Sequence, residues 1–189
     1  MQKNKKIIYV VEQIDWEAHQ PGGIQPIIRS QVLFDPGMNW ILVGTTQNPK
    51  ATLGKLKKVD WASNALFMPV LCTKQVNFKS LKGKNLIPVS LRFVIGLLRV
   101  RKELQFQVIH THRVELTVVI AMLSKGAKIV QFVHNASSNL TGSFTESKWR
   151  YFPRLYVYLR NSAIAKSRLS IIFSQEEYVT CSNVKSLKN

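Results

Sequence analysis

Three of the four histidines stand at the ends of short apolar runs, where a side chain can carry out chemistry without disturbing a core. His110 and His112 flank Thr111 at the end of one run, and His134 directly follows the run 128–133. A neutral imidazole donates one hydrogen bond and accepts another, so these residues could contact a substrate, move a proton or bind a metal. A zinc site needs three or four ligands, and no acidic or cysteine residue directly adjoins them, which disfavours a metal. For His134 a purely structural hydrogen bond stays open as the alternative.

A glycine pair, Gly22-Gly23, precedes a segment of helical period at residues 24–34. Glycines before a helix can bring backbone N–H groups close to a phosphate, helped by the positive end of the helix. An ordinary loop with two glycines is the alternative. The dinucleotide fingerprint G-x-G-x-x-G and the P-loop are both absent, which disfavours a classical dehydrogenase or NTPase.

Short apolar runs alternate with longer segments of helical period. The runs predict strands at residues 6–11, 40–44, 66–70, 107–110, 128–133 and 178–181, and the periodic segments predict helices at 24–34, 88–104, 114–123 and 150–167. Pro69 predicts that the third strand lies at a sheet edge, and residues 45–64 have no assigned element. Alternation of this kind predicts an α/β fold, a doubly wound and mainly parallel sheet with helices on both faces. The histidines and the glycine pair then lie at the carboxyl edge of the sheet, where such folds bind ligands.

The composition favours a globular protein with an anionic partner. Hydrophobic residues make up 46% of the 189 residues, enough for a core, and 27 Lys and Arg against 10 Asp and Glu give a net charge of +17. Two distant cysteines, Cys72 and Cys181, do not form a disulfide scaffold, which favours a reducing cytoplasmic compartment. We find no pattern of a signal peptide or of a membrane span, so we expect a cytoplasmic protein, in one interpretation peripheral at the inner face of the membrane.

The predicted helix at 88–104 mixes apolar and cationic residues. Phe93, Leu97 and Val100 share one face, and Arg92 and Arg99 lie elsewhere on the helical wheel. This segment either crosses over and packs on the sheet or lies on an anionic membrane surface, and the two roles are compatible. Nucleic acid is the less favoured anion, because no helix-turn-helix, zinc finger or RNP-type aromatic motif is present and the cations are scattered.

Four phrases, in this order, resemble the N-terminal domain of family 4 retaining glycosyltransferases, which have the GT-B fold. They are Gly22-Gly23, the strand running into His110-Thr111-His112, the strand running into His134, and Tyr178-Val-Thr-Cys-Ser182. The resemblance implies a Rossmann-like half of a GT-B fold over residues 1–189, as a single acceptor-side domain. It also implies that the nucleotide-sugar donor binds a second, C-terminal domain with a pair of glutamates separated by seven residues. No two acidic residues of this sequence have that spacing.

The resemblance further implies a function and a site. We expect the N-terminal half of an enzyme that moves a sugar from a nucleotide-sugar donor to a glycan or lipid-linked acceptor. The half should be inactive alone, completed by a separate C-terminal domain, and free of cofactor and metal. The resemblance also implies that His134 is catalytic and hydrogen-bonds the transferring sugar. The residues that it implies for binding the donor or the substrate are Gly22, Gly23, His110 and His112. A non-catalytic partner subunit and a basic nucleic-acid-binding protein are the alternatives.

Overall fold

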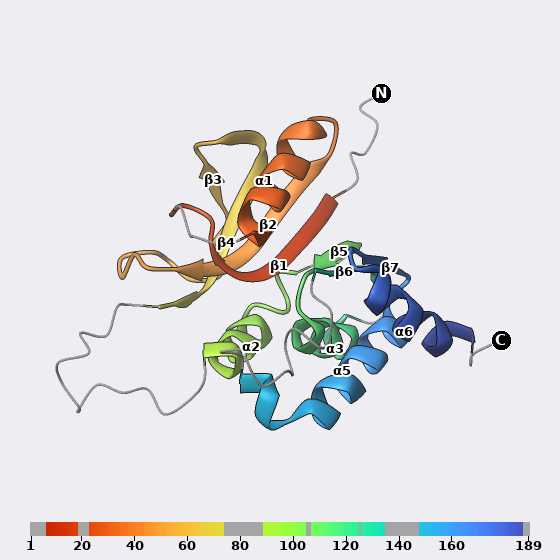
Figure 1. The fold of residues 1–189 in the computed structure, drawn as a ribbon. Helices are drawn as coiled ribbons and strands as arrows, with labels where there is room; N and C mark the ends of the chain where they lie inside the picture. Colours follow the sequence, from red (N-terminus) through yellow and green to blue (C-terminus); the bar gives the residue numbers. More distant parts are fainter. Residues whose placement is uncertain are drawn as a thin grey trace, which may run out of the picture. The chain divides into compact units, whose positions relative to one another are not determined.

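A computed structural model of the chain describes residues 7–18, 23–73, 89–104, 107–124, 126–134 and 148–186. The chain divides into two compact units, residues 1–107 and residues 108–189 (Figure 1). Within the described ranges no helix has the length and apolar character needed to cross a membrane.

Among the residues that the structure describes, the first unit contains four strands and two helices. They are β1 (Ile7–Asp15), α1 (Ile24–Phe34), β2 (Asn39–Thr46), β3 (Lys57–Val59), β4 (Ala62–Cys72) and α2 (Val89–Arg99). The strand order is β3-β4-β2-β1, and β1, β2 and β4 are parallel while β3 runs antiparallel to β4. Val10, Val11 and Leu42 are completely buried, as expected for apolar strands with neighbours on both faces.

Helix α1 packs on one face of this sheet. Its residues Ile28 and Val32 are completely buried and belong to the same apolar cluster as Trp16, which follows β1. Gly44 on β2 allows this packing, because a Cβ there would collide with the Ile14 carbonyl oxygen and the Trp16 ring. Helix α1 is therefore held against the sheet by large buried side chains.

Helix α2 packs against β4, as the crossover interpretation of this segment predicts. Phe93 and Leu97 are buried, and Gly96 lies so close to β4 that a Cβ would collide with the carbonyl oxygen of Val70. The opposite side of the helix is also apolar, because Leu91, Ile95 and Leu98 form an exposed stripe at helical spacing. Packing on the sheet therefore leaves a second apolar face outside.

In its described residues, the second unit contains three strands, three α-helices and one 3-10 helix. They are β5 (Val108–Thr111), α3 (Val114–Leu123), β6 (Lys128–Val133), the 3-10 helix η2 (Lys148–Tyr151), α5 (Pro153–Lys166), β7 (Leu169–Ile172) and α6 (Gln175–Ser186). Strand β6 lies between β5 and β7, and both pairings are parallel. Parallel strands alternating with helices in both units confirm the predicted fold class.

The helices of the second unit are joined by apolar packing and by one buried ion pair. Val114 and Val118 of α3 cluster with Tyr156 and Ala163 of α5. The guanidinium of Arg160 on α5 donates to the carboxylate of Glu177 on α6 over 2.8 Å, with both side chains nearly inaccessible. Removing one partner from such a pair would leave an uncompensated buried charge, so this bond fixes α6 against α5.

The predicted strand at Tyr178–Cys181 is wrong, because these residues lie in α6. Ser174 begins the helix by accepting a hydrogen bond from the Glu177 N–H over 3.4 Å, as in a Ser-x-x-Glu capping box. Glu177 and Cys181, four residues apart, are buried, and Tyr178 is exposed, which is helical spacing. Ser182 is therefore an exposed helical residue and not the end of a strand. The last strand is β7, which the sequence analysis missed.

The predicted edge position of the strand around Pro69 is also wrong. Strand β4 lies between β2 and β3. Proline is tolerated because β3 pairs only as far as Phe67, and because the register with β2 shifts directly after the Gly44–Pro69 pair. The unassigned interval 45–64 contains the end of β2, all of β3 and the start of β4.

Candidate functional site

The parallel register of β5 and β6 brings the three predicted histidines together. Thr111 is paired with Gln131, so His112 follows β5 beside Phe132, and His134 follows the end of β6. His110 lies two residues earlier along the chain, on the same side of the strand, and its ring contacts the same phenylalanine ring. Within the second unit, His112 and His134 thus follow strand ends as predicted, and His110 lies within β5, one residue before its last.

His112 and His134 are directly hydrogen-bonded. The Nδ1 atom of His112 lies 2.6 Å from the Nε2 atom of His134. The two ring planes differ by only 12°, with centroids 4.9 Å apart. A nitrogen–nitrogen contact this short between nearly coplanar rings is an edge-to-edge hydrogen bond, not face-to-face stacking.

Two phenylalanines hold the imidazole rings. Phe132 stacks on His112 at a centroid distance of 4.7 Å and an interplanar angle of 9°, and Phe173 is nearly parallel to His134 at 4.9 Å and 10°. Phe173 follows β7 and is fixed by a hydrogen bond from its N–H to the Val133 carbonyl. Phe173 is not among the residues predicted from the sequence, because the strand that positions it was not predicted either. The signal available was an aromatic residue directly after the short apolar run 169–172.

A pair of buried threonines fixes the end of β5. Thr117 in α3 donates to the carbonyl oxygen of Arg113 over 2.9 Å, so its Oγ1 is left to accept from Thr111 at 2.7 Å. Both hydroxyl groups are completely buried. The first turn of α3 is therefore attached to the residue between the two histidines.

Burial keeps the histidine cluster uncharged. Desolvation lowers the pKa of His110 to about 4. Desolvation, together with the neighbouring imidazoles of His134 and His110, lowers the pKa of His112 to about 3. Burial also lowers the pKa of His134, which is only half-buried. At neutral pH the cluster therefore consists of neutral imidazoles, which hydrogen-bond a ligand without charge.

This cluster can form hydrogen bonds to the polar groups of a ligand. Neutral imidazoles suit hydroxyl groups and phosphate oxygens, and only the half-buried rings can meet a ligand. Over the part of the chain that the structure describes, no three side chains of His, Cys, Asp or Glu are grouped so that they could hold a metal ion.

Gly23 belongs to the first unit, where it precedes α1 with a φ of −79°. A Cβ at this position would meet nothing within 4 Å, so neither strain nor crowding requires glycine there. Gly22 lies outside the described residues. The roles predicted for this pair remain predictions.

The loop between β1 and α1 is held by Asp15 and Gln25, which the sequence analysis did not single out. The Asp15 carboxylate accepts hydrogen bonds from the N–H groups of Glu17 and Gln47 over 3.0 and 2.8 Å. The Gln25 amide donates to the carbonyl oxygens of Asp15 and Ala18 over 3.0 and 2.8 Å. Both side chains are buried, which is typical of residues that shape a loop.

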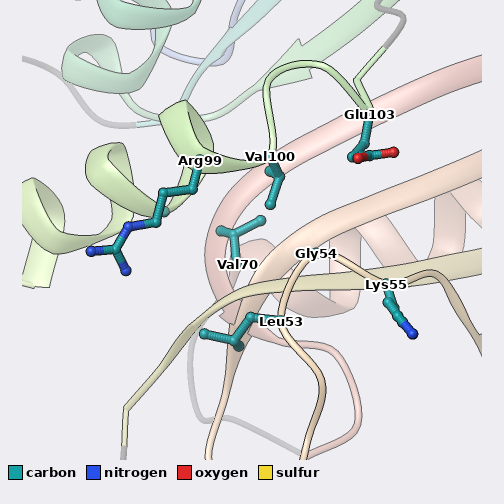
Figure 2. Close-up of a pocket in the computed structure, with 8 residues that line it drawn as sticks. Leu53, Gly54, Lys55, Val70, Arg99, Val100 and Glu103 are labelled. Carbon is teal, nitrogen blue, oxygen red and sulfur yellow. The ribbon is translucent and has the colours of Figure 1, made fainter.

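A cavity of about 510 Å³ lies in the first unit, beside the end of α2. Val70 and Val100 point toward one another at its centre, and the charged ends of Arg99 and Lys55 point away from them (Figure 2). Convergent polar groups are what fix a ligand in a pocket. The histidine cluster is therefore the better candidate site.

Comparison with known proteins identifies the fold. No family model and no curated protein sequence matches the chain. Its structure is similar to that of sucrose-phosphate synthase from Thermosynechococcus elongatus, with a TM-score of 0.63 and 12% identical residues. The match covers 93% of this chain and 45% of that chain, so this chain spans less than half the length of that protein.

The chain has the fold of one GT-B domain. This confirms the fold that the sequence phrases implied. At this level of identity the likeness concerns the fold alone, and the function has to be argued from the residues.

The neutral histidines predict sensitivity to acid. Each has a lower pKa when folded than its ordinary value of 6.5, so below that pH the unfolded chain binds more protons and stability falls with acidification. His112 alone should contribute roughly 1.4 kcal/mol for each pH unit between 6 and 4. Urea unfolding measured from pH 7 to pH 4 should therefore show a smaller loss of stability in His112→Phe than in the wild type. Equal slopes in the two proteins would contradict neutral burial of His112.

Proposed function

We propose that this chain is the acceptor-side half of a glycosyltransferase, which moves a sugar from a nucleotide-sugar donor to a glycan or lipid-linked acceptor. The observation that carries the proposal is the cluster of neutral histidines at the carboxyl ends of β5 and β6, in a domain of GT-B fold. Ligands of open parallel sheets bind at this edge. Sugars and diphosphates present the hydroxyl and phosphate oxygens with which neutral imidazoles form hydrogen bonds.

Within the proposed reaction, His134 contacts the transferring sugar and His110 and His112 support it. His134 is the half-buried member of the hydrogen-bonded pair, so it is the one suited to meet a ligand. Its lowered pKa fits an orienting contact more than a charged one. The resemblance to retaining enzymes implies that the donor phosphate helps to deprotonate the acceptor hydroxyl and that Gly22 and Gly23 approach the donor.

We further propose that the donor nucleotide is bound by a second domain and that this chain alone does not catalyse sugar transfer. The related synthase is more than twice as long as the matched region, in keeping with a second domain. A non-catalytic subunit that completes such a domain is the alternative. Both predict an interaction with a donor-binding domain, and they differ in whether His134 affects the rate.

Sugar transfer by the completed enzyme tests this function. The chain alone should give no product from a panel of nucleotide sugars with glycan and lipid-linked acceptors. Combined with a donor-binding domain encoded in the same or the neighbouring gene, it should transfer. His134→Ala should then lower kcat by about five- to a hundredfold, because losing a hydrogen bond so that a polar substrate group is left unsatisfied costs about 1–3 kcal/mol.

Val179→Ala, an exposed position on α6 in the same unit, is the matched control and should leave the rate unchanged. Turnover by the chain alone would refute the need for a second domain. An unchanged rate in His134→Ala would refute the role of this histidine and favour the non-catalytic subunit.

We also propose that the exposed stripe of α2 meets an anionic membrane surface at the cytoplasmic face. Leu91, Ile95 and Leu98 are 51%, 36% and 39% exposed, on the side of the helix away from the buried Phe93. Arg99 lies beside the stripe at the end of the helix, in a chain with a net charge of +17. An apolar face flanked by cations is the pattern of helices that lie in a membrane interface.

Vesicle binding tests the stripe. Leu91→Gln, Ile95→Gln and Leu98→Gln together should weaken binding to vesicles containing phosphatidylglycerol by about tenfold or more, because each side chain loses roughly 1 kcal/mol of apolar burial. Phe34→Gln, at a position 91% exposed at the end of α1, should have no effect. Failure of the wild type to bind vesicles, together with salt-sensitive binding to oligonucleotides, would favour the nucleic-acid alternative.

A further inference from the structure

The hydrogen bond between His112 and His134 requires that the two rings share one proton. Nδ1 of His112 and Nε2 of His134 are 2.6 Å apart, so one of them carries a hydrogen and the other accepts it. Because both rings are neutral, each carries a single N–H, and the choice made in this bond fixes the position of the proton on both rings. Two arrangements satisfy the bond.

The arrangements differ at the remaining nitrogen of His112. Its Nε2 atom is buried and has no hydrogen-bond partner among the residues that the structure describes. If His134 donated, this nitrogen would carry a buried N–H with no acceptor. If His112 donates, the same nitrogen is a bare acceptor. Orphaned buried donors are rarer in proteins than orphaned acceptors, so the second arrangement is favoured.

We infer that His112 is a positioning residue, which donates from Nδ1 to Nε2 of His134 and so holds His134 in the Nδ1–H tautomer. His134 then offers a ligand a hydrogen-bond donor, and its basic nitrogen is occupied within the protein. The complementary ligand group is an oxygen acceptor, such as a hydroxyl, phosphate or carboxylate oxygen. A role for His134 as the base that deprotonates the acceptor is excluded by this arrangement.

The surroundings of His112 support a fixed donor. Phe132 stacks on its ring at 4.7 Å, and the preceding residue, Thr111, is tied to Thr117 of α3. Ring and backbone are thus held on two sides, while His134 is only half-buried. The identity of the ligand rests on the proposed function, but the tautomer does not.

The tautomers can be read directly from the chain. Long-range ¹H–¹⁵N correlation spectra of chain with ¹⁵N-labelled histidine, at pH 7.5, distinguish the Nδ1–H from the Nε2–H form of each imidazole. The four histidines give few enough signals for assignment by single substitutions. We expect the Nδ1–H pattern for both His112 and His134, opposite to the Nε2–H form that free histidine prefers.

His112→Phe keeps the aromatic contact with Phe132 but removes the donor, and it should convert His134 from mainly Nδ1–H to mainly Nε2–H. His110→Phe is the matched control, because its ring also contacts Phe132, and it should leave the tautomer of His134 unchanged. An Nε2–H pattern for His134 in the wild type would overturn the inference, and so would an unchanged pattern in a folded His112→Phe. If that variant does not fold, the wild-type spectrum decides. This experiment measures no sugar transfer, so a result that overturned the tautomer of His134 would not refute the proposed function, which has a separate test.

Discussion

The hydrogen bond between His112 and His134 joins the ends of two neighbouring strands, and the arrangement of the second unit serves to make it. It requires β5 and β6 to be parallel and in the register that pairs Thr111 with Gln131, because a slip of one residue would turn one histidine to the other face of the sheet. It also requires Phe132 and Phe173 to hold the rings. β7 and α3 supply the remaining constraints, one through Phe173 and the other through the threonine pair.

The histidine cluster that contains this hydrogen bond is an uncharged site in a strongly basic chain. The net charge is +17, yet burial lowers the histidine pKa values so that the cluster is neutral. A site that bound an anion by charge alone would be expected to use exposed cations. A neutral donor is better suited to distinguishing one oxygen of a polar ligand by geometry, while the excess charge is left to act at other surfaces.

Much of the fold could be predicted from the sequence because the core elements have strong periodicity. The structure has α1, α3 and β6 at the predicted bounds, and His112 and His134 directly follow β5 and β6, while His110 lies within β5. Tyr178–Cys181 was misjudged because β-branched and aromatic residues favour strands, whereas here the Ser174 cap and the buried Arg160–Glu177 pair favour a helix. β7 is short and half-exposed, so its weak pattern hid Phe173. The pairing of His112 with His134 depends on strand register, which the sequence does not specify.

The most direct test of the account is whether a sugar ligand reaches His134. Imidazole ¹³Cε1 signals of the four histidines would be followed while the chain is titrated with nucleotide sugars, glycans and an oligonucleotide. The account predicts that a sugar-containing ligand shifts the His134 signal, with smaller shifts at His110 and His112, and that the oligonucleotide does not. If the oligonucleotide shifted the His134 signal and no nucleotide sugar or glycan did, the account would be contradicted.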